Sequence, residues 1–209
     1  MTAGVRARRK AERPGEILEA AFEEFVQKGF AGTRLEDVAA RAGVTKGTVY
    51  FYFESKEQVF ASMVRAVMQP VHSRVTEFLD STPEPAPAFV ERLLLYLFDM
   101  IATDPRPREI IRLLIAEARQ FPNLVDEHYE RFMQPIIERV QVSLDKGALM
   151  GAIRPSAVQS APEVLISPAW ALGVWMLLFA DRKLADTEAY HRAAVDMILH
   201  GLLPRHSST

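Results

Sequence analysis

Apolar residues recur at helical spacing on both sides of a glycine between residues 33 and 53, TRLEDVAARAGVTKGTVYFYF. Before that glycine, one apolar face is formed by Leu35, Val38, Ala39 and Ala42. Gly43 suits the left-handed residue that ends a helix, and Thr45 is a good N-cap for the next one. In that second helix, Lys46 to Tyr52, Val49 faces back toward the first helix. The pattern predicts a helix-turn-helix, whose second helix lies in the DNA major groove.

The rest of the chain also follows the helical period and has no sustained period-two alternation. Pro14 opens a first helix that Gly29 ends, and Ser55 with Gln58 forms a capping box for a fourth. The fourth helix either kinks near Pro70 or divides there. Further helices are predicted at about 89–103, 107–120, 123–146 (followed by helix stops at Gly147 and Gly151), 161–181, and from Asp186 or Thr187 to before Pro204. The predicted fold is all-α, with about nine helices.

Composition and charge narrow the function classes. The 209 residues contain no cysteine, which excludes a disulfide scaffold and a cysteine-ligated zinc site and fits a reducing cytosol. The formal net charge is −2, but residues 1–13 hold five Lys/Arg against one Asp/Glu, a local charge of +4. We interpret residues 1–13 as a basic flexible arm that meets DNA phosphates. The alternative is a solvated, disordered tail without a binding role.

One uncharged run raises the question of a membrane. Residues 164–180 carry no charge and include Trp170 and Trp175, but 17 residues are at the short end for a span. Pro162 and Pro168 weaken a membrane interpretation further. We expect a helix buried on nearly all sides, as at a subunit interface, and no membrane partner. The N-terminus has no apolar signal-peptide core, so we expect a cytoplasmic protein.

Beyond these patterns, AGVTKGTVYFYFESKEQVF resembles the N-terminal DNA-binding domain of the TetR family of transcriptional repressors. The resemblance is carried by Gly43, Val44, residues 45–48, Tyr50, Phe53, Ser55, Lys56 and Glu57, and it covers residues 14–62. Residues 112–124, RLLIAEARQFPNL, also look like the C-terminal domain of AefR-type relatives. The resemblance implies a helix-turn-helix DNA-binding domain at 14–54 and a C-terminal ligand-binding and dimerisation domain at 55–209.

The resemblance also implies which residues bind DNA. By position, these are Thr33, Arg34, Thr45, Lys46, Gly47, Thr48, Tyr50, Phe51 and Lys56. Thr33, Arg34 and Lys56 open helices, whose N-termini attract phosphate, although Arg34 departs from the Thr or Ser common there. Phe51 either touches a thymine methyl or covers the edge of the domain. Val49 and Phe53 are interpreted as core.

A dimer is expected, because one helix-turn-helix reads only a few base pairs. Two of them related by a two-fold axis would read a palindromic operator. The best dimer surface is the apolar run 164–180 with the last helix, where Ala194, Met197, Ile198 and Leu202 share a face. Paired with their mates, these helices would make a four-helix bundle in a homodimer.

The family resemblance further implies a small-molecule effector that releases the protein from DNA by a population shift. Candidate contacts in the C-terminal domain are Phe98, Met100, Phe121, His128, Tyr129, Phe132, Trp170 and Trp175. Apolar residues at helical spacing are usually only core, so each candidate has that competing explanation. The predicted pocket is apolar overall, which suggests a hydrophobic or aromatic inducer.

Other function classes leave signatures that this chain lacks. The five histidines (His72, His128, His191, His200 and His206) have no metal-ligand spacing, and no nucleophile motif or phosphate-binding glycine loop occurs. We therefore expect no enzyme activity, no metal and no cofactor. The predicted function is a ligand-responsive repressor. The alternatives are a TetR-like activator, a DNA-binding protein without an inducer or without sequence preference, and a membrane-attached interaction protein.

Overall fold

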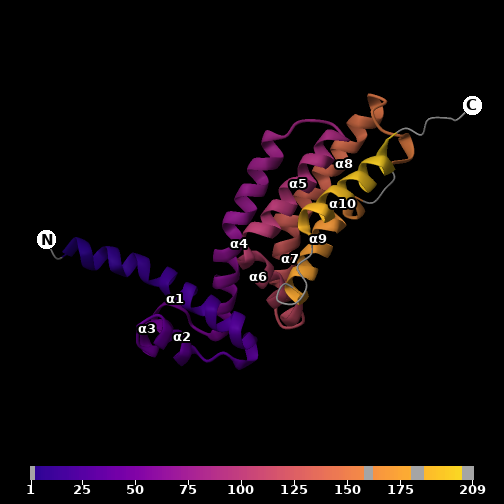
Figure 1. Ribbon diagram of the computed structural model, residues 1–209. Helices are drawn as coiled ribbons and strands as arrows, with labels where there is room; N and C mark the ends of the chain where they lie inside the picture. Colours follow the sequence, from indigo (N-terminus) through magenta and orange to yellow (C-terminus); the bar gives the residue numbers. More distant parts are fainter. Residues whose placement is uncertain (1–2, 158–161, 180–185, 204–209) are drawn as a thin grey trace, which may run out of the picture. The chain divides into compact units, whose positions relative to one another are not determined.

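The computed structural model describes residues 3–157, 162–179 and 186–203, with side chains from residue 12 onward (Figure 1). Within those residues every regular element is helical, which confirms the predicted all-α class. The elements are α1 (Ala3–Gly32), α2 (Leu35–Arg41), α3 (Lys46–Tyr52), α4 (Lys56–Ser81), α5 (Ala88–Thr103), α6 (Pro105–Glu117), α7 (Pro122–His128), the π-helix η1 (Tyr129–Met133), α8 (Gln134–Leu149), the 3₁₀ turn η2 (Pro155–Ala157), α9 (Pro162–Phe179) and α10 (Thr187–Leu202). If the unbroken run 122–149 counts as one helix, the described part of the chain has nine helices and the short η2 turn.

One predicted boundary differs from the structure at the start of the chain. α1 begins at Ala3 instead of Pro14, because residues 3–13 are rich in good helix formers and a proline is tolerated at the cost of one hydrogen bond. The flexibility predicted for residues 1–13 stays a prediction. Of the two alternatives predicted for the fourth helix, the structure has the single one: α4 runs through Pro70, which is exposed.

The chain divides into two compact units. The first contains the residues up to Val71 together with Glu109–Val125, and the second contains His72–Arg108 together with the residues from Asp126 onward. These units are not the same as the domains predicted at 14–54 and 55–209, which are functional modules and stay a prediction.

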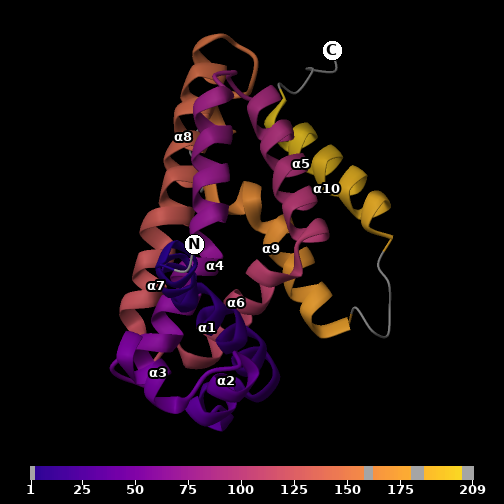
Figure 2. The same cartoon turned by 90° about the vertical axis from the view of Figure 1, so that its left-hand side faces the viewer.

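In the first unit, α1, α2 and α3 pack side by side (Figures 1 and 2). Gly29 breaks α1 with φ 70°, as a helix stop requires, and Phe30 folds back into an aromatic cluster. Phe30 meets Phe25, Phe60 and Phe121 with ring centroids 4.9–5.8 Å apart. From α6, the Arg112 side chain donates to the Val26 carbonyl at 2.8 Å. The end of α1, next to the helix-turn-helix, is therefore held by aromatic packing and by the bond from Arg112.

In the second unit, α5 packs against α8, α9 and α10 (Figure 2). Gly147 was predicted to end α8, and that prediction is wrong. It lies inside the helix, which continues to Leu149. A Cβ there would lie 2.5 Å from the Ala86 carbonyl oxygen, so glycine allows the 82–87 loop to approach the helix closely. The Ala86 amide donates to the Ser143 carbonyl at the same contact, 3.0 Å away.

α9 is only partly buried within the single chain, so its expected burial at a subunit interface stays a prediction. It is the one described helix long and apolar enough to cross a membrane, and only 22% of it is buried within the protomer. Val164 and Leu178 are each 61% exposed, and Trp175 is 43% exposed. On α10, Met197 is 74% exposed. The apolar face of α9 and α10 is thus left without a cover among the described residues.

Candidate DNA-binding surface

The turn between α2 and α3 is built as the sequence predicts. Gly43 has φ 64°, a left-handed conformation that favours glycine, and the Val44 amide donates to the Ala39 carbonyl at 2.9 Å. Thr45 caps α3, because its hydroxyl accepts from the Thr48 amide at 3.2 Å. Val49 is fully buried against the α2 side of the motif. These contacts fix the angle at which α3 presents its outer face.

The outer face of α3 holds most of the predicted DNA contacts. Thr45, Lys46, Gly47, Tyr50 and Phe51 are exposed, and Thr48 is half-buried. Phe51 is 69% exposed and its ring meets the Tyr52 ring edge-on at 5.0 Å. These six residues lie together on one short helix and its cap. Their contact with DNA stays a prediction.

Lys46 is held by an acidic neighbour within the motif. Its ammonium lies 2.5 Å from the Glu36 carboxylate of α2 and 5.6 Å from the centre of the Tyr50 ring. The hydrogen bond between Lys46 and Glu36 raises the pKa of Lys46 and lowers the pKa of Glu36. Both side chains are about half exposed, so the pair can exchange with solvent or with a DNA phosphate.

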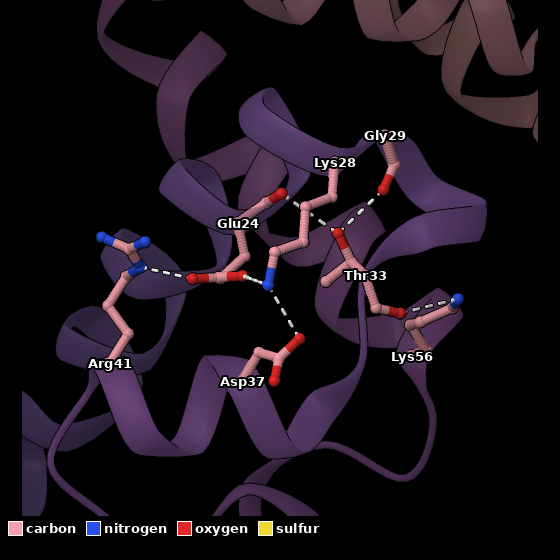
Figure 3. A network of polar contacts seen from close by, with 7 residues as sticks. All are labelled: Glu24, Lys28, Gly29, Thr33, Asp37, Arg41 and Lys56. Atoms are coloured by element: carbon pink, nitrogen blue, oxygen red, sulfur yellow. Dashed lines mark hydrogen bonds and ion pairs between the residues drawn. The ribbon is translucent and has the colours of Figure 1, made fainter.

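The three predicted phosphate contacts outside α3 have different surroundings. Arg34 is exposed and precedes α2 without a side-chain capping bond. Thr33 is buried, and its hydroxyl shares one proton between the Gly29 and Glu24 carbonyl oxygens, 2.8 and 3.1 Å away (Figure 3). The Thr33 side chain therefore faces the protein interior, where it joins α1 to the loop before α2.

Lys56 also makes internal bonds. Its ammonium donates to the Phe30 carbonyl at 2.9 Å and to the Thr33 carbonyl at 3.1 Å, and lies 4.4 Å from the centre of the Phe30 ring. Figure 3 shows Lys56 reaching the Thr33 carbonyl. Two of its three protons are therefore used to hold the α1–α2 connection, and a phosphate would have only the third or would displace a carbonyl.

A buried carboxylate that the sequence analysis did not select joins α1 to α2. Glu24 is 4% exposed, and its two oxygens lie 2.6 Å from the Lys28 ammonium and 2.6 Å from the Arg41 guanidinium (Figure 3). Lys28 also pairs with Asp37 at 2.8 Å. Hydrogen bonds from Lys28 and then Arg41 lower the pKa of Glu24. The spacing from Glu24 to Lys28 is that of an ordinary helical ion pair, so spacing alone does not indicate that the Glu24 carboxylate is buried.

The predicted ligand contacts do not form one group. Phe121 belongs to the aromatic cluster of the first unit. In the second unit, Phe98 stacks on His191 at 4.2 Å, and Trp175 meets Phe179 at 4.7 Å. Met100 and Trp170 are half-buried, and Tyr129 is 51% exposed. Their contact with a ligand stays a prediction.

His128 and Phe132 do lie together, and His72 joins them. The rings of His128 and Phe132 stack with centroids 5.2 Å apart, and the His72 ring is 6.2 Å from His128. Burial and the neighbouring His72 lower the pKa of His128 to about 4. Sequence analysis missed His72 as a ligand candidate, although it falls beside the apolar stripe of α4 four residues after Met68.

Two family models match this chain. Residues 17–63 match the model described as bacterial regulatory proteins of the tetR family. Residues 89–201, more than half of the chain, match the AefR-like transcriptional repressor C-terminal domain. The chain belongs to the TetR family. The α2–α3 motif is thus the helix-turn-helix of a TetR-family transcriptional regulator.

Individual TetR-family proteins are similar over much of the chain. The HTH-type transcriptional regulator YhgD of Bacillus subtilis is 27% identical over 139 residues, which are 66% of this chain and 71% of YhgD. Bacillus subtilis FadR, solved in complex with stearoyl-CoA, is 21% identical with a TM-score of 0.65, over 89% of this chain and 97% of FadR. A Saccharomonospora viridis regulator solved with choline is 19% identical with a TM-score of 0.74, over 93% of this chain and 100% of that regulator. At these identities, the two solved structures establish the TetR fold and nothing about the ligand.

Proposed function

We propose that the protein is a ligand-responsive repressor that binds a palindromic operator as a homodimer and is released by a small, largely hydrophobic molecule. The observation that carries the proposal is the exposed apolar face of α9 and α10, combined with a single helix-turn-helix in each chain. Val164 and Leu178 of α9 and Met197 of α10 are more than half exposed, so both helices leave large apolar side chains uncovered by the described residues. A second copy of the chain gives this face a cover and supplies the second recognition helix.

The apolar effector is supported by the chemistry of the second unit. Its core contains large apolar side chains such as Phe89, Leu93 and Phe98. The structurally similar FadR and Saccharomonospora viridis regulators were solved with stearoyl-CoA and choline, so this architecture accepts ligands of different chemistry. The effector of this protein must therefore be inferred from its own side chains. Binding would favour a conformation in which the two recognition helices no longer fit successive major grooves.

The first test selects bound sequences from a random duplex DNA pool at moderate, fixed salt, because phosphate contacts are salt-sensitive. Recovery of an inverted repeat, with a sedimenting mass of two chains, supports the proposal. Sequences without two-fold symmetry, or a monomer bound to DNA, overturn the dimeric operator. Mass spectrometry after denaturation identifies any effector that purified with the protein and would keep it off DNA.

The second test removes two exposed side chains of α3 together. Lys46→Ala with Tyr50→Phe should weaken operator binding by more than ~10-fold and reduce the slope of log affinity against log salt by about one, because one phosphate-facing cation is lost. Helix content and dimer mass should stay unchanged, because neither side chain is buried. Lys146→Ala, which removes an exposed charge from α8, is the matched control and should leave operator binding unchanged. Loss of folding in the double variant would mean that these residues are core.

A further inference from the structure

Two histidines and a phenylalanine in the second unit form a small cluster with unusual hydrogen bonding. His72 comes from α4, His128 is the last residue of α7, and Phe132 lies in η1. The His128 and Phe132 rings are nearly parallel, 15° apart, and the His72 ring lies 6.1 Å from Phe132. Each of the three rings is thus in contact with the other two. We call these three residues the His72–His128–Phe132 cluster.

Three of the four imidazole nitrogens of this cluster have no hydrogen-bond partner among the described residues. Nδ1 and Nε2 of His128 and Nε2 of His72 are enclosed, and no described residue donates to them or accepts from them. Buried polar atoms in native proteins are nearly always paired with protein groups, water or a ligand, because leaving them unpaired is costly. Three such atoms on two neighbouring rings, with centroids 6.2 Å apart, leave hydrogen-bonding capacity that a polar group from outside the chain can use.

The backbone at the cluster is also irregular. Residues 129–133 form a π-helix between α7 and α8, and Phe132 occupies its fourth position. A π-turn is less stable than an α-turn and is found mostly where a side chain has a functional placement. Here it places Phe132 face to face with His128, four residues earlier. The irregular helix geometry thus begins directly after His128, whose ring nitrogens are unpaired.

The charge state of the two imidazole rings decides which polar group can pair with their nitrogens. Burial lowers the pKa of both histidines, so both are neutral at pH 7. A neutral imidazole presents one N–H donor and one acceptor nitrogen. The complement of such a pair is a group that both accepts and donates, which is a hydroxyl. A carboxylate only accepts, and an ammonium only donates, so each would leave one kind of ring nitrogen unpaired and would be a buried charge.

Charged neighbours do not alter this choice. Arg131 and Glu127 both lie near His72 and act on its pKa in opposite directions. They pair with each other at 3.5 Å. The lowering by Arg131 is larger than the raising by Glu127, so these two charges do not oppose the lowering of the His72 pKa by burial.

We propose that His72 and His128 bind the hydroxyl group of an uncharged amphipathic effector whose apolar body packs on Phe132. The proposal rests on the effector-released repressor argued above and names the chemical class of its effector. Because the ring nitrogens are enclosed, the effector selects a conformation in which they become reachable. The short helix α7 ends at His128, so a ligand bound to the His128 ring would change the position of α7 or be limited by it.

The test uses four probes that share one apolar ring system and differ in the polar group: 2-naphthol, 2-methylnaphthalene, 2-naphthoate and 2-naphthylmethylammonium. Calorimetry on the full-length protein should give 2-naphthol an affinity at least ~10-fold above the other three, as two new hydrogen bonds to neutral rings would give. His128→Phe should reduce this preference to within about two-fold. His128→Gln, which keeps one donor and one acceptor, should retain most of it.

His200→Phe is the matched control, because His200 is an exposed histidine whose side chain is 72% accessible. It should leave all four affinities unchanged. Nitrogen-15 spectra of histidine-labelled protein should show the His72 and His128 ring signals shifting with 2-naphthol and the His200 signals unchanged. Absence of 2-naphthol binding, a preference that survives His128→Phe, or ring signals that report bound water only would each overturn the inference.

Operator binding measured without any probe separates this inference from the proposed function. If the protein binds an inverted repeat as a dimer but ignores 2-naphthol, the effector class is wrong and the regulator stands. If 2-naphthol binds through the histidines and operator affinity stays the same, the site stands and release by an effector is wrong.

Discussion

Glu24 and His128 both have enclosed polar atoms, but only those of Glu24 are paired within the protein. Glu24, in the first unit, is a carboxylate whose oxygens are both occupied by cations at 2.6 Å. His128, in the second unit, has two ring nitrogens that no described residue contacts by hydrogen bonding. Glu24 therefore keeps its charge and its pKa falls, whereas His128 loses its charge because its pKa falls to about 4.

The difference suits Glu24 to a structural role and His128 to the ligand-binding role proposed above. A fully paired group contributes to one fixed arrangement, here the attachment of α2 to α1, and has no capacity left for a ligand. An unpaired group leaves the structure less stable than it could be and gives a ligand something to satisfy. The Lys46–Glu36 pair is intermediate, because it is paired but exposed and can exchange its partner.

The largest effect should come from removing the unpaired imidazole. An unfolded histidine titrates near 6.5, while His128 in the folded protein titrates near 4. Between these values the unfolded chain binds more protons, so the free energy of unfolding falls as pH is lowered, by on the order of 3 kcal/mol in total. His128→Phe should remove this loss, leaving the smaller ones from His72 and His191, whose pKa values burial lowers in the same direction.

Urea unfolding of the wild type and the variant at intervals from pH 7 to pH 4 measures the difference. His200→Phe should keep the full wild-type slope. Equal slopes for wild type and His128→Phe would mean that the His128 ring nitrogens are solvated and not enclosed.

A smaller effect should come from the paired carboxylate. Glu24→Gln removes the charge and leaves Lys28 and Arg41 without their shared partner, which should lower the free energy of unfolding at pH 7 by about 2 kcal/mol. Breaking a buried pair costs more than this, but the two cations are 36% and 43% exposed and regain water. Chemical denaturation followed by circular dichroism gives the value.

The pH dependence of the Glu24 contribution has its own window. Because the folded-state pKa lies below the model value of 4.5, the stabilisation is present above pH 4.5 and is lost as pH falls through the lowered pKa. Asp37→Asn, at the exposed end of the network, should cost clearly less than Glu24→Gln. A larger cost for Asp37→Asn would place the important partner of Lys28 on α2 and not on Glu24.

The smallest effect concerns the exchangeable pair. Glu36→Gln frees Lys46 from its intramolecular partner, so binding to non-specific duplex DNA should strengthen by roughly 3-fold, with a steeper salt dependence. Operator binding should gain less, so that the ratio of specific to non-specific affinity falls. Fluorescence anisotropy with operator and scrambled duplexes measures both, and Glu91→Gln on α5 is the control for loss of one negative charge. Unchanged non-specific binding would mean that Glu36 does not compete with phosphate.

Local sequence signals predicted the helix-turn-helix well. The glycine at 43, the Thr45 cap and the buried Val49 act within a few residues, so spacing alone identifies them. One of the two bonds of the predicted capping box of α4 is present, since the backbone N–H of Gln58 donates to the Ser55 hydroxyl at 3.1 Å; the Gln58 side chain accepts from the backbone N–H of Glu54 instead of Ser55. Family membership, confirmed by both family models, was readable from the same short segment.

Contacts between distant residues were not predictable from these signals. Lys56 was selected for its place at a helix start, yet the carbonyls that it binds are 23 and 26 residues earlier. His72 and His128 are 56 positions apart, and only the packing of α4 beside the π-helix brings their rings together. Gly147 was taken as a helix stop because spacing does not show that another segment approaches it.

The exposed face of α9 and α10 has a consequence for the abundance of the proposed dimer. A protomer that has lost its mate presents Leu178 and Met197 to the proteases and chaperones that recognise apolar surface. Mass action increases the fraction of such protomers as copy number falls. Degradation would then accelerate as the pool shrinks, so a gradual dilution during cell division would end in rapid clearance of the regulator.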